Sequence, residues 1–246
     1  MRIFAIVSYN GTNYAGWQKQ PNALTVQEVI ETDLSKIFNR KINIQGAGRT
    51  DAGVHALGQT FHFDLDEKMV DLDKLIYSLN SMLPPDIKIE DMQEVDEDFH
   101  ARFSATEKVY GYSIILSSKD VLLYQITYPC PYDLNLELLK ECLTHFEGKH
   151  NFKNFTSKDE DDDGFIREIY EVDIDETSNN GSIHIIFRGN GFMRYMIRYM
   201  VGTAIEVARG KVTLEEVDEL LDDGSERKIV SWKAPASGLM LLEVKY

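Results

Sequence analysis

A short glycine-rich loop carries the residue types best suited to chemistry. Residues 46–56 read GAGRTDAGVHA, so that Arg49, Asp51 and His55 stand among three glycines. Glycine permits backbone angles and close approaches that a side chain would forbid. An aspartate two residues from a permanent cation should stay ionised near neutral pH, while His55 could act as an acid or base, contact a ligand or cap the loop. The alternative interpretation is a surface turn in which the aspartate supports its own backbone.

Cations elsewhere in the chain could meet an anionic ligand. Arg194 and Arg198 are four residues apart in an apolar segment with helical periodicity, which predicts that they share one helix face. A planar guanidinium suits a phosphate or a catalytic carboxylate, although a surface acid could pair with it instead. Further cations stand next to aromatic or glycine positions, a mixture suited to backbone phosphates and stacked bases. These are Lys19, Arg102, Lys108 and Arg167, each of which could equally be a scattered surface charge.

Several kinds of site lack their sequence patterns. The six histidines and two cysteines form no HExxH or CxxC pair, so no metal site is predicted. Cys130 and Cys142 are far apart and are expected to be free thiols in a reducing cytoplasm. No phosphate-binding Walker loop, dinucleotide fingerprint or serine-hydrolase elbow occurs, and therefore we expect no cofactor.

The overall charge is strongly negative, which by itself argues against a polyanionic partner. The 246 residues include 26 basic and 41 acidic ones, for a formal charge of −15. Acids gather in three stretches, 64–73, 94–98 and 159–163, so a basic cleft can exist elsewhere on the surface. Since no run approaches the roughly 20 apolar residues of a membrane span and no signal peptide is visible, a cytoplasmic protein is expected.

The elements that must position these residues follow from hydrophobic periodicity. A strand at 2–8 is followed by a polar loop, in which Trp17 is either a core residue or a stacking surface, and by a helix at 26–38 that begins with a capping box. A strand at 42–45 should end at the glycine loop, and one at 59–63 should leave it. The remaining predictions are helices at 72–82, 134–146, 192–208 and 214–221, and strands at 87–95, within 102–116, at 166–174 and 182–187 around a turn at 178–181, and at 238–246.

This order predicts an α+β fold, with a mixed, largely antiparallel sheet and helices packed on it. We expect two halves, an N-terminal α+β half at 1–104 that carries the glycine loop and a C-terminal α+β half at 105–246. No flexible linker marks the boundary between them.

Several motifs together resemble one enzyme family. GRTDAGVHA at 48–56 is similar to the signature of the TruA type of pseudouridine synthases, and the similarity continues in order along essentially the whole chain. The other matching motifs are YNGTNYAGWQKQ at 9–20, TVQEVIE at 25–31, FHARFSATEKVYGYSI at 99–114, FMRYMIRYMVG at 192–202 and APASGL at 234–239. The stretch at 107–109 departs from the family pattern, since many relatives are more basic there.

The resemblance implies roles for individual residues. It places the family's catalytic aspartate on Asp51 and assigns Arg49 and Arg198 as its cationic partners, with Arg49 also helping to flip the target base. Tyr110 and Leu239 fall on the residues that pack against that base. It also implies two similar halves flanking a central cleft. Arg102, Lys19, Arg167 and His55 are our further candidates for contacts with the substrate.

The resemblance implies isomerisation of uridine to pseudouridine at positions 38, 39 and 40 in the anticodon arm of tRNAs, by a homodimer without a cofactor. Asp51 would either attack the sugar at C1′ or remove its C2′ proton, and the sequence does not choose between nucleophile and base. A tRNA-binding module or RNA chaperone with little catalysis is the alternative. An aspartate-dependent glycosidase is disfavoured because no second carboxylate stands beside Asp51.

Overall fold

The computed structural model describes residues 1–66, 69–116, 121–160, 164–178 and 181–246. Within them the chain forms two compact units, one made of Met1–Thr106 with Met240–Tyr246 and the other of Glu107–Leu239. The end of the chain differs from the expectation, because Met240–Tyr246 belongs to the first unit rather than to the C-terminal half. Parts of the acidic stretches 64–73 and 159–163 and of the predicted turn at 178–181 lie outside the described residues.

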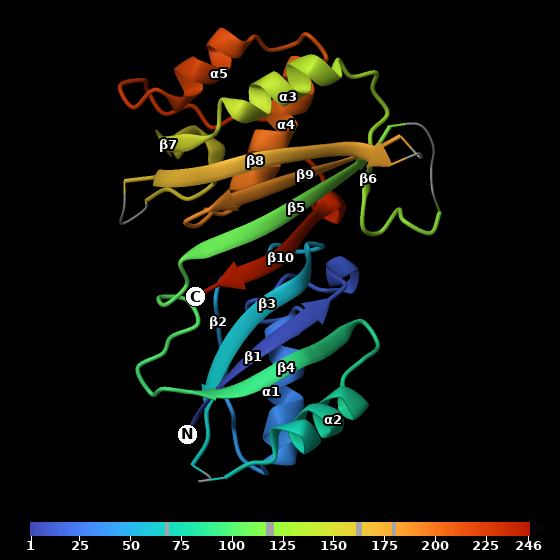
Figure 1. Ribbon diagram of the computed structural model, residues 1–246, viewed down its shortest axis with the longest axis vertical. Coiled ribbons are helices and arrows are strands. Elements are labelled where there is room, and N and C mark those ends of the chain that lie inside the picture. Colours follow the sequence, from blue (N-terminus) through green and yellow to red (C-terminus); the bar gives the residue numbers. More distant parts are fainter. Residues whose placement is uncertain (67–68, 117–120, 161–163, 179–180) are drawn as a thin grey trace. The chain divides into compact units, whose positions relative to one another are not determined.

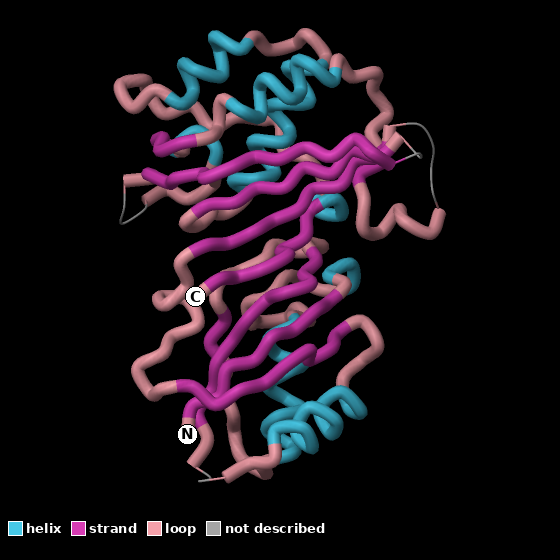
Figure 2. Tube along the Cα trace, in the orientation of Figure 1, coloured by secondary structure: helices cyan, strands magenta, loops and turns pink. Residues whose placement is uncertain are grey.

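The first unit is a sheet with two helices (Figures 1 and 2). Its strands are ordered β4-β1-β3-β10, and β2 pairs with β3. Strand β1 is antiparallel to both β3 and β4, whereas β10 is parallel to β3 with Met240 opposite His55. The strands are β1 (Arg2–Tyr9), β2 (Gln45–Gly46), β3 (His55–Asp64), β4 (Ile87–Val95) and β10 (Leu239–Lys245), and the helices are α1 (Val26–Ile37) and α2 (Leu72–Met82).

Amphipathic patterns explain most of this unit. Ile30 and Leu34 lie on one face of α1 and are fully buried, and Val7 of β1 is likewise inaccessible. The Thr25 side chain accepts a hydrogen bond from the Glu28 N–H at 3.4 Å and so begins α1 at the predicted position. Helix α2 has the predicted bounds, and it ends immediately before Leu83 and the two following prolines.

The predicted strand at 42–45 is wrong in its extent. Only Gln45 and Gly46 pair with a neighbouring strand, opposite His62 and Phe61. Before them, the Ile42 N–H donates to the Ser35 hydroxyl at 2.9 Å and the Ile44 N–H donates to the Glu31 carboxylate at 3.1 Å. Side chains of α1 therefore satisfy the backbone groups that a strand partner would otherwise satisfy.

The second unit is also a sheet with helices. Its strands are ordered β5-β9-β8-β7 and are mutually antiparallel, and β6 adds a short parallel pairing to β5. The strands are β5 (Glu107–Ile115), β6 (Tyr128–Pro129), β7 (Gly148–Asn151), β8 (Ile166–Ser178) and β9 (Ser182–Gly189), and the helices are α3 (Leu136–Thr144), α4 (Met196–Ala208) and α5 (Leu214–Leu221). Helix α3 packs against α4 and β8.

Helix α4 begins later than its hydrophobic pattern predicts. Tyr195 has φ of +65°, in the left-handed region, so a right-handed helix cannot include it and α4 starts at Met196. Arg194 therefore lies before the helix, and the prediction that it shares a helix face with Arg198 is wrong. Every residue of α4 except Arg198 and Glu206 is buried, which makes Arg198 a cation at the edge of an apolar helix.

The predicted fold class is confirmed. Both units combine helices with sheets that are antiparallel apart from the β3–β10 and β5–β6 pairings. In the part of the chain that the structure describes, no helix has the length and apolar character needed to cross a membrane.

Candidate active site

The glycine loop is held by the segment that follows β1. The Trp17 N–H donates to the Thr50 carbonyl at 3.1 Å, and the Gly53 N–H donates to the Tyr14 carbonyl at 3.3 Å. A third bond joins the two hydroxyls of Tyr9 and Thr50 at 2.8 Å. Two stretches that matched family motifs separately, 9–20 and 48–56, thus form one hydrogen-bonded assembly within the first unit.

Close packing explains two glycines of this assembly. A Cβ on Gly11 would lie 2.0 Å from the Val54 carbonyl oxygen, and a Cβ on Gly46 would lie 2.4 Å from the Trp17 indole nitrogen. Neither position has room for a side chain. Trp17 is 1% exposed, which confirms the interpretation of this residue as part of the core.

Asp51 follows a buried residue at the centre of the loop. Thr50 is buried with its hydroxyl bonded to Tyr9, whereas Asp51 is half-buried and Arg49 is exposed. The Val54 N–H donates to the Asp51 carbonyl at 3.1 Å, which closes a tight turn around the aspartate. The loop therefore holds the Asp51 backbone in place, at a position where the residue is only half-buried.

Hydrogen bonds to side chains of the first unit orient the Arg49 guanidinium. Its Nε donates to the Gln18 amide oxygen at 3.3 Å, and the Gln18 amide nitrogen donates to the Gln27 amide oxygen at 2.8 Å. This chain of amides links the loop to the first turn of α1. The predicted partnership of Arg49 with Asp51 stays a prediction.

His55 and Lys19 have local structural contacts. His55 is 1% exposed, and its Nδ1 accepts the Gly11 N–H at 3.0 Å, so the ring fixes the turn that abuts the glycine loop. The Lys19 ammonium lies 3.3 Å from the Glu31 carboxylate. The contacts of His55 and Lys19 with substrate stay predictions.

The second unit brings Tyr110 and the C-terminal motif to the same sheet region. Tyr110 on β5 packs edge-on against Phe192, with ring centroids 5.3 Å apart. Its neighbour Tyr112 donates from its hydroxyl to the Pro235 carbonyl at 2.9 Å, and Gly238 leaves space for the Tyr112 ring. Leu239 directly after this glycine is 5% exposed.

Arg198 is fastened to the same motif. Its Nε donates to the Ala234 carbonyl at 2.8 Å, and the Ala234 N–H donates back to the Arg198 carbonyl at 2.9 Å. One turn later, the Trp232 carbonyl lies so close to Gly202 that a Cβ there would be 2.3 Å from it. The segment before η3 (Ala236–Gly238) therefore runs along α4 and sets the direction of the Arg198 guanidinium.

Three cations surround one aromatic ring in the second unit. The guanidinium carbons of Arg194 and Arg198 lie 4.8 and 5.4 Å from the centre of the Tyr195 ring, and the Lys233 ammonium lies 4.1 Å from it. In the part of the chain that the structure describes, no carboxylate forms an ion pair with Arg194 or Lys233. We call Arg194, Arg198, Lys233 and Tyr195 the cation cluster. It can attract an anion such as a phosphate.

Sequence reasoning missed Tyr195 and Lys233 as members of this cluster. Lys233 directly precedes the APASGL motif, which is the signal that could have drawn attention to it. The two remaining predicted contact residues lie in different units. Arg102 is exposed on the connection between β4 and β5, and Arg167 is half-buried on β8, where it donates to the Ile166 carbonyl at 2.5 Å.

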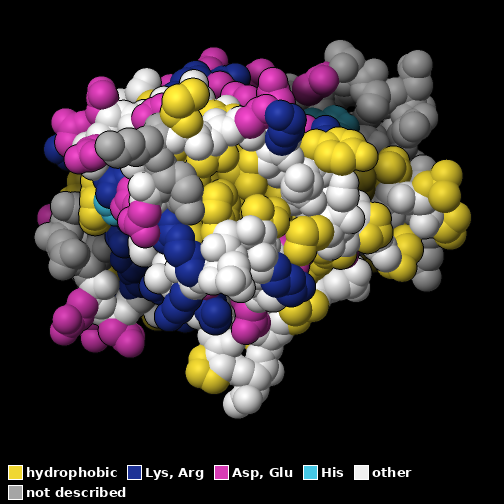
Figure 3. Space-filling model, turned by 90° about the horizontal axis from the view of Figure 1, so that it is seen from below, with side chains coloured by type: hydrophobic (Ala, Val, Ile, Leu, Met, Phe, Trp, Pro, Cys, Tyr) yellow, Lys and Arg dark blue, Asp and Glu magenta, His cyan; other side chains and the backbone are white. Residues whose placement is uncertain are grey.

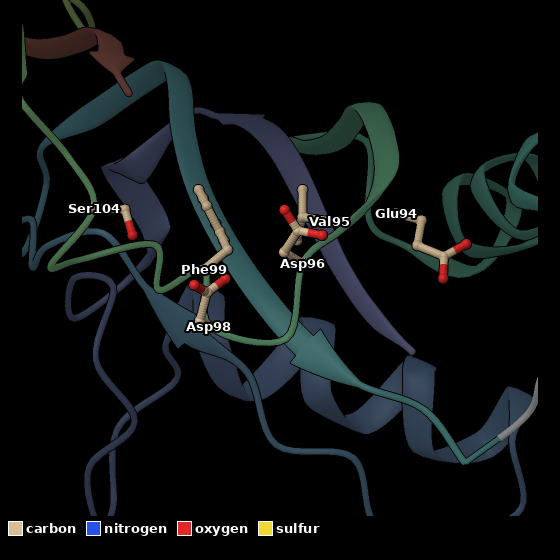
Figure 4. Close-up of a pocket in the computed structure, with 6 residues that line it drawn as sticks. All are labelled: Glu94, Val95, Asp96, Asp98, Phe99 and Ser104. Atoms are coloured by element: carbon tan, nitrogen blue, oxygen red, sulfur yellow. The ribbon is translucent and has the colours of Figure 1, made fainter.

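An acidic hollow in the first unit is a poor candidate for the same ligand. Figure 4 shows this cavity of about 630 Å³, lined by Glu94, Val95, Asp96, Asp98, Phe99 and Ser104. Its carboxylates would repel a phosphate. On the face shown in Figure 3, by contrast, Lys and Arg side chains stand in a group, with most acidic side chains nearer the margin. Positive charge is therefore gathered locally despite the negative total.

Comparisons with known proteins place these residues in a family context. The family model described as tRNA pseudouridine synthase matches residues 5–104 and 143–246. The tRNA pseudouridine synthase A of Streptococcus mutans serotype c is 35% identical over 100% of this chain and 99% of its own length, and that of Acetivibrio thermocellus is 40% identical over 98% of each. A solved archaeal box H/ACA sRNP Nop10-Cbf5 complex covers 82% of this chain and 44% of that chain at 13% identity, with a TM-score of 0.38.

Proposed function

The chain belongs to the tRNA pseudouridine synthase family, and we propose that it isomerises uridine to pseudouridine at positions 38, 39 and 40 in the anticodon arm of tRNAs. The observation that carries this proposal is the glycine loop, which hydrogen bonds join to the 9–17 segment and in which Asp51 is half-buried. The reaction is an isomerisation of tRNA uridine, and the proposed site of modification is the anticodon arm.

The chemistry balances without a second reactant. The C1′–N1 bond of uridine breaks, the uracil turns while it is held, and a new bond joins C5 to C1′. The proton lost from C5 is matched by the proton gained at N1. One carboxylate suffices for this reaction, either as a nucleophile at C1′ or as a base at C2′.

Each predicted site residue has a role in this proposal. Arg49 and Arg198 keep Asp51 ionised, at the cost of some basicity, and Tyr110 and Leu239 pack against the target base. A base inside a stem must leave its stack, which costs a few kcal/mol that contacts with the RNA offset. The residues proposed for those contacts are Arg102, Lys19, Arg167 and His55, and the cation cluster adds Arg194 and Lys233 for backbone phosphates.

Replacement of Asp51 tests the catalytic assignment. With Asp51→Asn or Asp51→Ala, we expect pseudouridine formation on an unmodified tRNA transcript to fall by at least about three orders of magnitude, because the reacting group is gone. Pseudouridine mapping after incubation without metal or nucleotide measures this loss, and gel-shift titration should show that tRNA binding persists. Asp91→Asn, an exposed carboxylate on β4, is the matched control and should keep full activity.

Two outcomes would change the assignment. Turnover retained by Asp51→Asn would remove Asp51 from its catalytic role. A wild-type protein that binds tRNA yet forms no pseudouridine at any anticodon-arm uridine would instead be an RNA-binding module or chaperone.

The same proposal includes a homodimer that acts in the cytoplasm. Its support is the resemblance to the family, including a relative that aligns with the whole chain. We expect light scattering at working concentration to give twice the 28.2 kDa mass of one chain. A monomeric mass would overturn the dimer.

A further inference from the structure

A tight turn between β4 and β5 exposes a phenylalanine. Phe103 is 76% accessible, although Ala101 two residues before it is fully buried. Single exposed apolar side chains are common and by themselves need no explanation. The feature that sets Phe103 apart is the number of contacts that hold its turn in place.

Three side chains anchor the turn to the first unit. His62 of β3 accepts the Ala101 N–H at its Nδ1 over 3.1 Å, and the Tyr246 hydroxyl donates to the Ala101 carbonyl at 2.9 Å. Arg2 of β1 donates to the Phe99 carbonyl at 2.8 Å. The backbone that enters the turn is therefore tied to both ends of the chain and to the central sheet.

Hydrogen bonds within the turn fix its shape. The His100 N–H donates to the Ser104 hydroxyl at 3.0 Å, and the Ser104 N–H donates to the His100 carbonyl at 2.9 Å. The His100 Nδ1 accepts the Arg102 N–H at 3.1 Å. Because folding already orders this turn, binding a ligand there costs less conformational entropy than binding to a mobile loop would.

The Phe103 ring is backed on one side and flanked by a cation. Its centroid lies 4.4 Å from that of His100, which in turn lies 4.7 Å from that of His62. The guanidinium carbon of the exposed Arg102 lies over the Phe103 ring, 5.5 Å from its centre. Since three quarters of Phe103 stays accessible with His100 and Arg102 against it, the ring and the guanidinium together offer an exposed stacking surface that carries a positive charge.

Nucleobases are the ligands that this combination suits. Unstacked bases in RNA stack on aromatic rings and on arginine planes, and the interaction tolerates any base. Asp96 and Asp98 in the adjoining acidic hollow would repel a phosphate placed there, but they exert no net repulsion on an uncharged base. The chemistry around Phe103 therefore favours a base over a phosphate.

We propose that Phe103, backed by His100 and flanked by Arg102, is a stacking platform for one unpaired base of the tRNA, other than the uridine that is isomerised. The proposal rests on the proposed function for its substrate class. It adds a binding contact that is separate from the glycine loop and the cation cluster. Phe103 therefore contributes to affinity for tRNA without taking part in the chemical step.

The test compares two equally exposed aromatic residues of the same unit. Tyr77 on α2 is 77% exposed and serves as the matched control for Phe103. We expect Phe103→Ala to weaken binding of an unmodified tRNA transcript roughly 5- to 150-fold, the range of one base–aromatic stack. Tyr77→Ala should bind within twofold of wild type. The kcat of Phe103→Ala at saturating tRNA should stay within threefold of wild type.

A third variant reports the stack directly. In Phe103→Trp, affinity should be kept, and the added tryptophan fluorescence should be quenched by tRNA beyond the quenching seen for wild type. Circular dichroism and light scattering of all variants check that folding and oligomeric state are unchanged.

The outcomes separate the platform from the proposed function. Active wild-type protein, together with unchanged tRNA affinity in Phe103→Ala or no added quenching in Phe103→Trp, would overturn the platform alone. A change of oligomeric mass in Phe103→Ala would instead make this surface a contact between copies of the chain and would also overturn it. Wild-type protein that binds no tRNA would overturn both proposals.

Discussion

At the scale of single residues, His62 links the sheet to the turn that presents Phe103. Its Nδ1 accepts the Ala101 N–H, and a ring that accepts there must be neutral. Burial, with His100 and Arg2 nearby, lowers the pKa of His62 to about 4, while Asp64 acts in the opposite direction. Between that value and the ordinary pKa of 6.5, the unfolded chain binds a proton that the folded protein excludes.

The free energy of unfolding should therefore decrease as the pH falls from about 6.5 to about 4. Between pH 7 and pH 5 we expect His62 to remove about 2 kcal/mol from the free energy of unfolding, since each pKa unit corresponds to about 1.4 kcal/mol. Urea unfolding of wild type and His62→Gln at both pH values measures the difference. Glutamine can accept the same N–H without titrating, so the variant should lose less stability on acidification. Equal losses in both proteins would contradict this role of His62.

Residue types and short spacings singled out the glycine loop as a candidate site but did not predict the contacts that hold it. Asp51 and Arg49 stand out because a cation and a carboxylate lie two residues apart in a glycine-rich stretch, although Gly and Asp are also common in structural turns. The contacts that hold the loop join Tyr9 to Thr50 and Gly11 to His55, which are 41 and 44 residues apart. No local pattern in the sequence reports such a pairing.

At the scale of elements, hydrophobic periodicity predicted the helices and strands whose secondary structure is determined by their own sequence. Helix α2 and helix α5 match their predicted ranges because each has an apolar stripe between a capping residue and a clear end. The segment at 42–44 is as apolar as a strand, yet side chains of α1 take its backbone donors. Periodicity also cannot locate the left-handed Tyr195, which delays the start of α4.

The last strand shows why the two units could not be assigned by order alone. The sequence predicts a strand at 238–246, but nothing in its local pattern says which sheet the strand joins. Their parallel pairing with β3 returns the chain to the first unit, and the Thr106 N–H donates to the Lys245 carbonyl at 2.8 Å. Such pairings depend on the whole fold and leave no local signal.

At the scale of the whole molecule, the negative total charge has to be reconciled with an RNA substrate. A charge of −15 repels a polyanion at long range, so binding depends on cations whose charge no nearby carboxylate cancels. Arg194 and Lys233 of the cation cluster meet this condition among the described residues. Gathering them around Tyr195 costs mutual repulsion, which a bound phosphate would relieve.

Two substitutions that change the total charge equally separate the local effect from the long-range one. Lys233→Gln and Lys211→Gln each take the formal charge from −15 to −16. Lys211 is exposed just beyond the far end of α4, a helix about 20 Å long.

If the cation cluster holds a backbone phosphate, Lys233→Gln should weaken tRNA binding and reduce the slope of log K against log salt by roughly 0.7 to 0.9. Lys211→Gln should leave that slope unchanged, because it alters only the long-range field. Titrations of an unmodified transcript at several salt concentrations measure both slopes. Equal changes in the two variants would mean that total charge, rather than the cation cluster, sets the affinity.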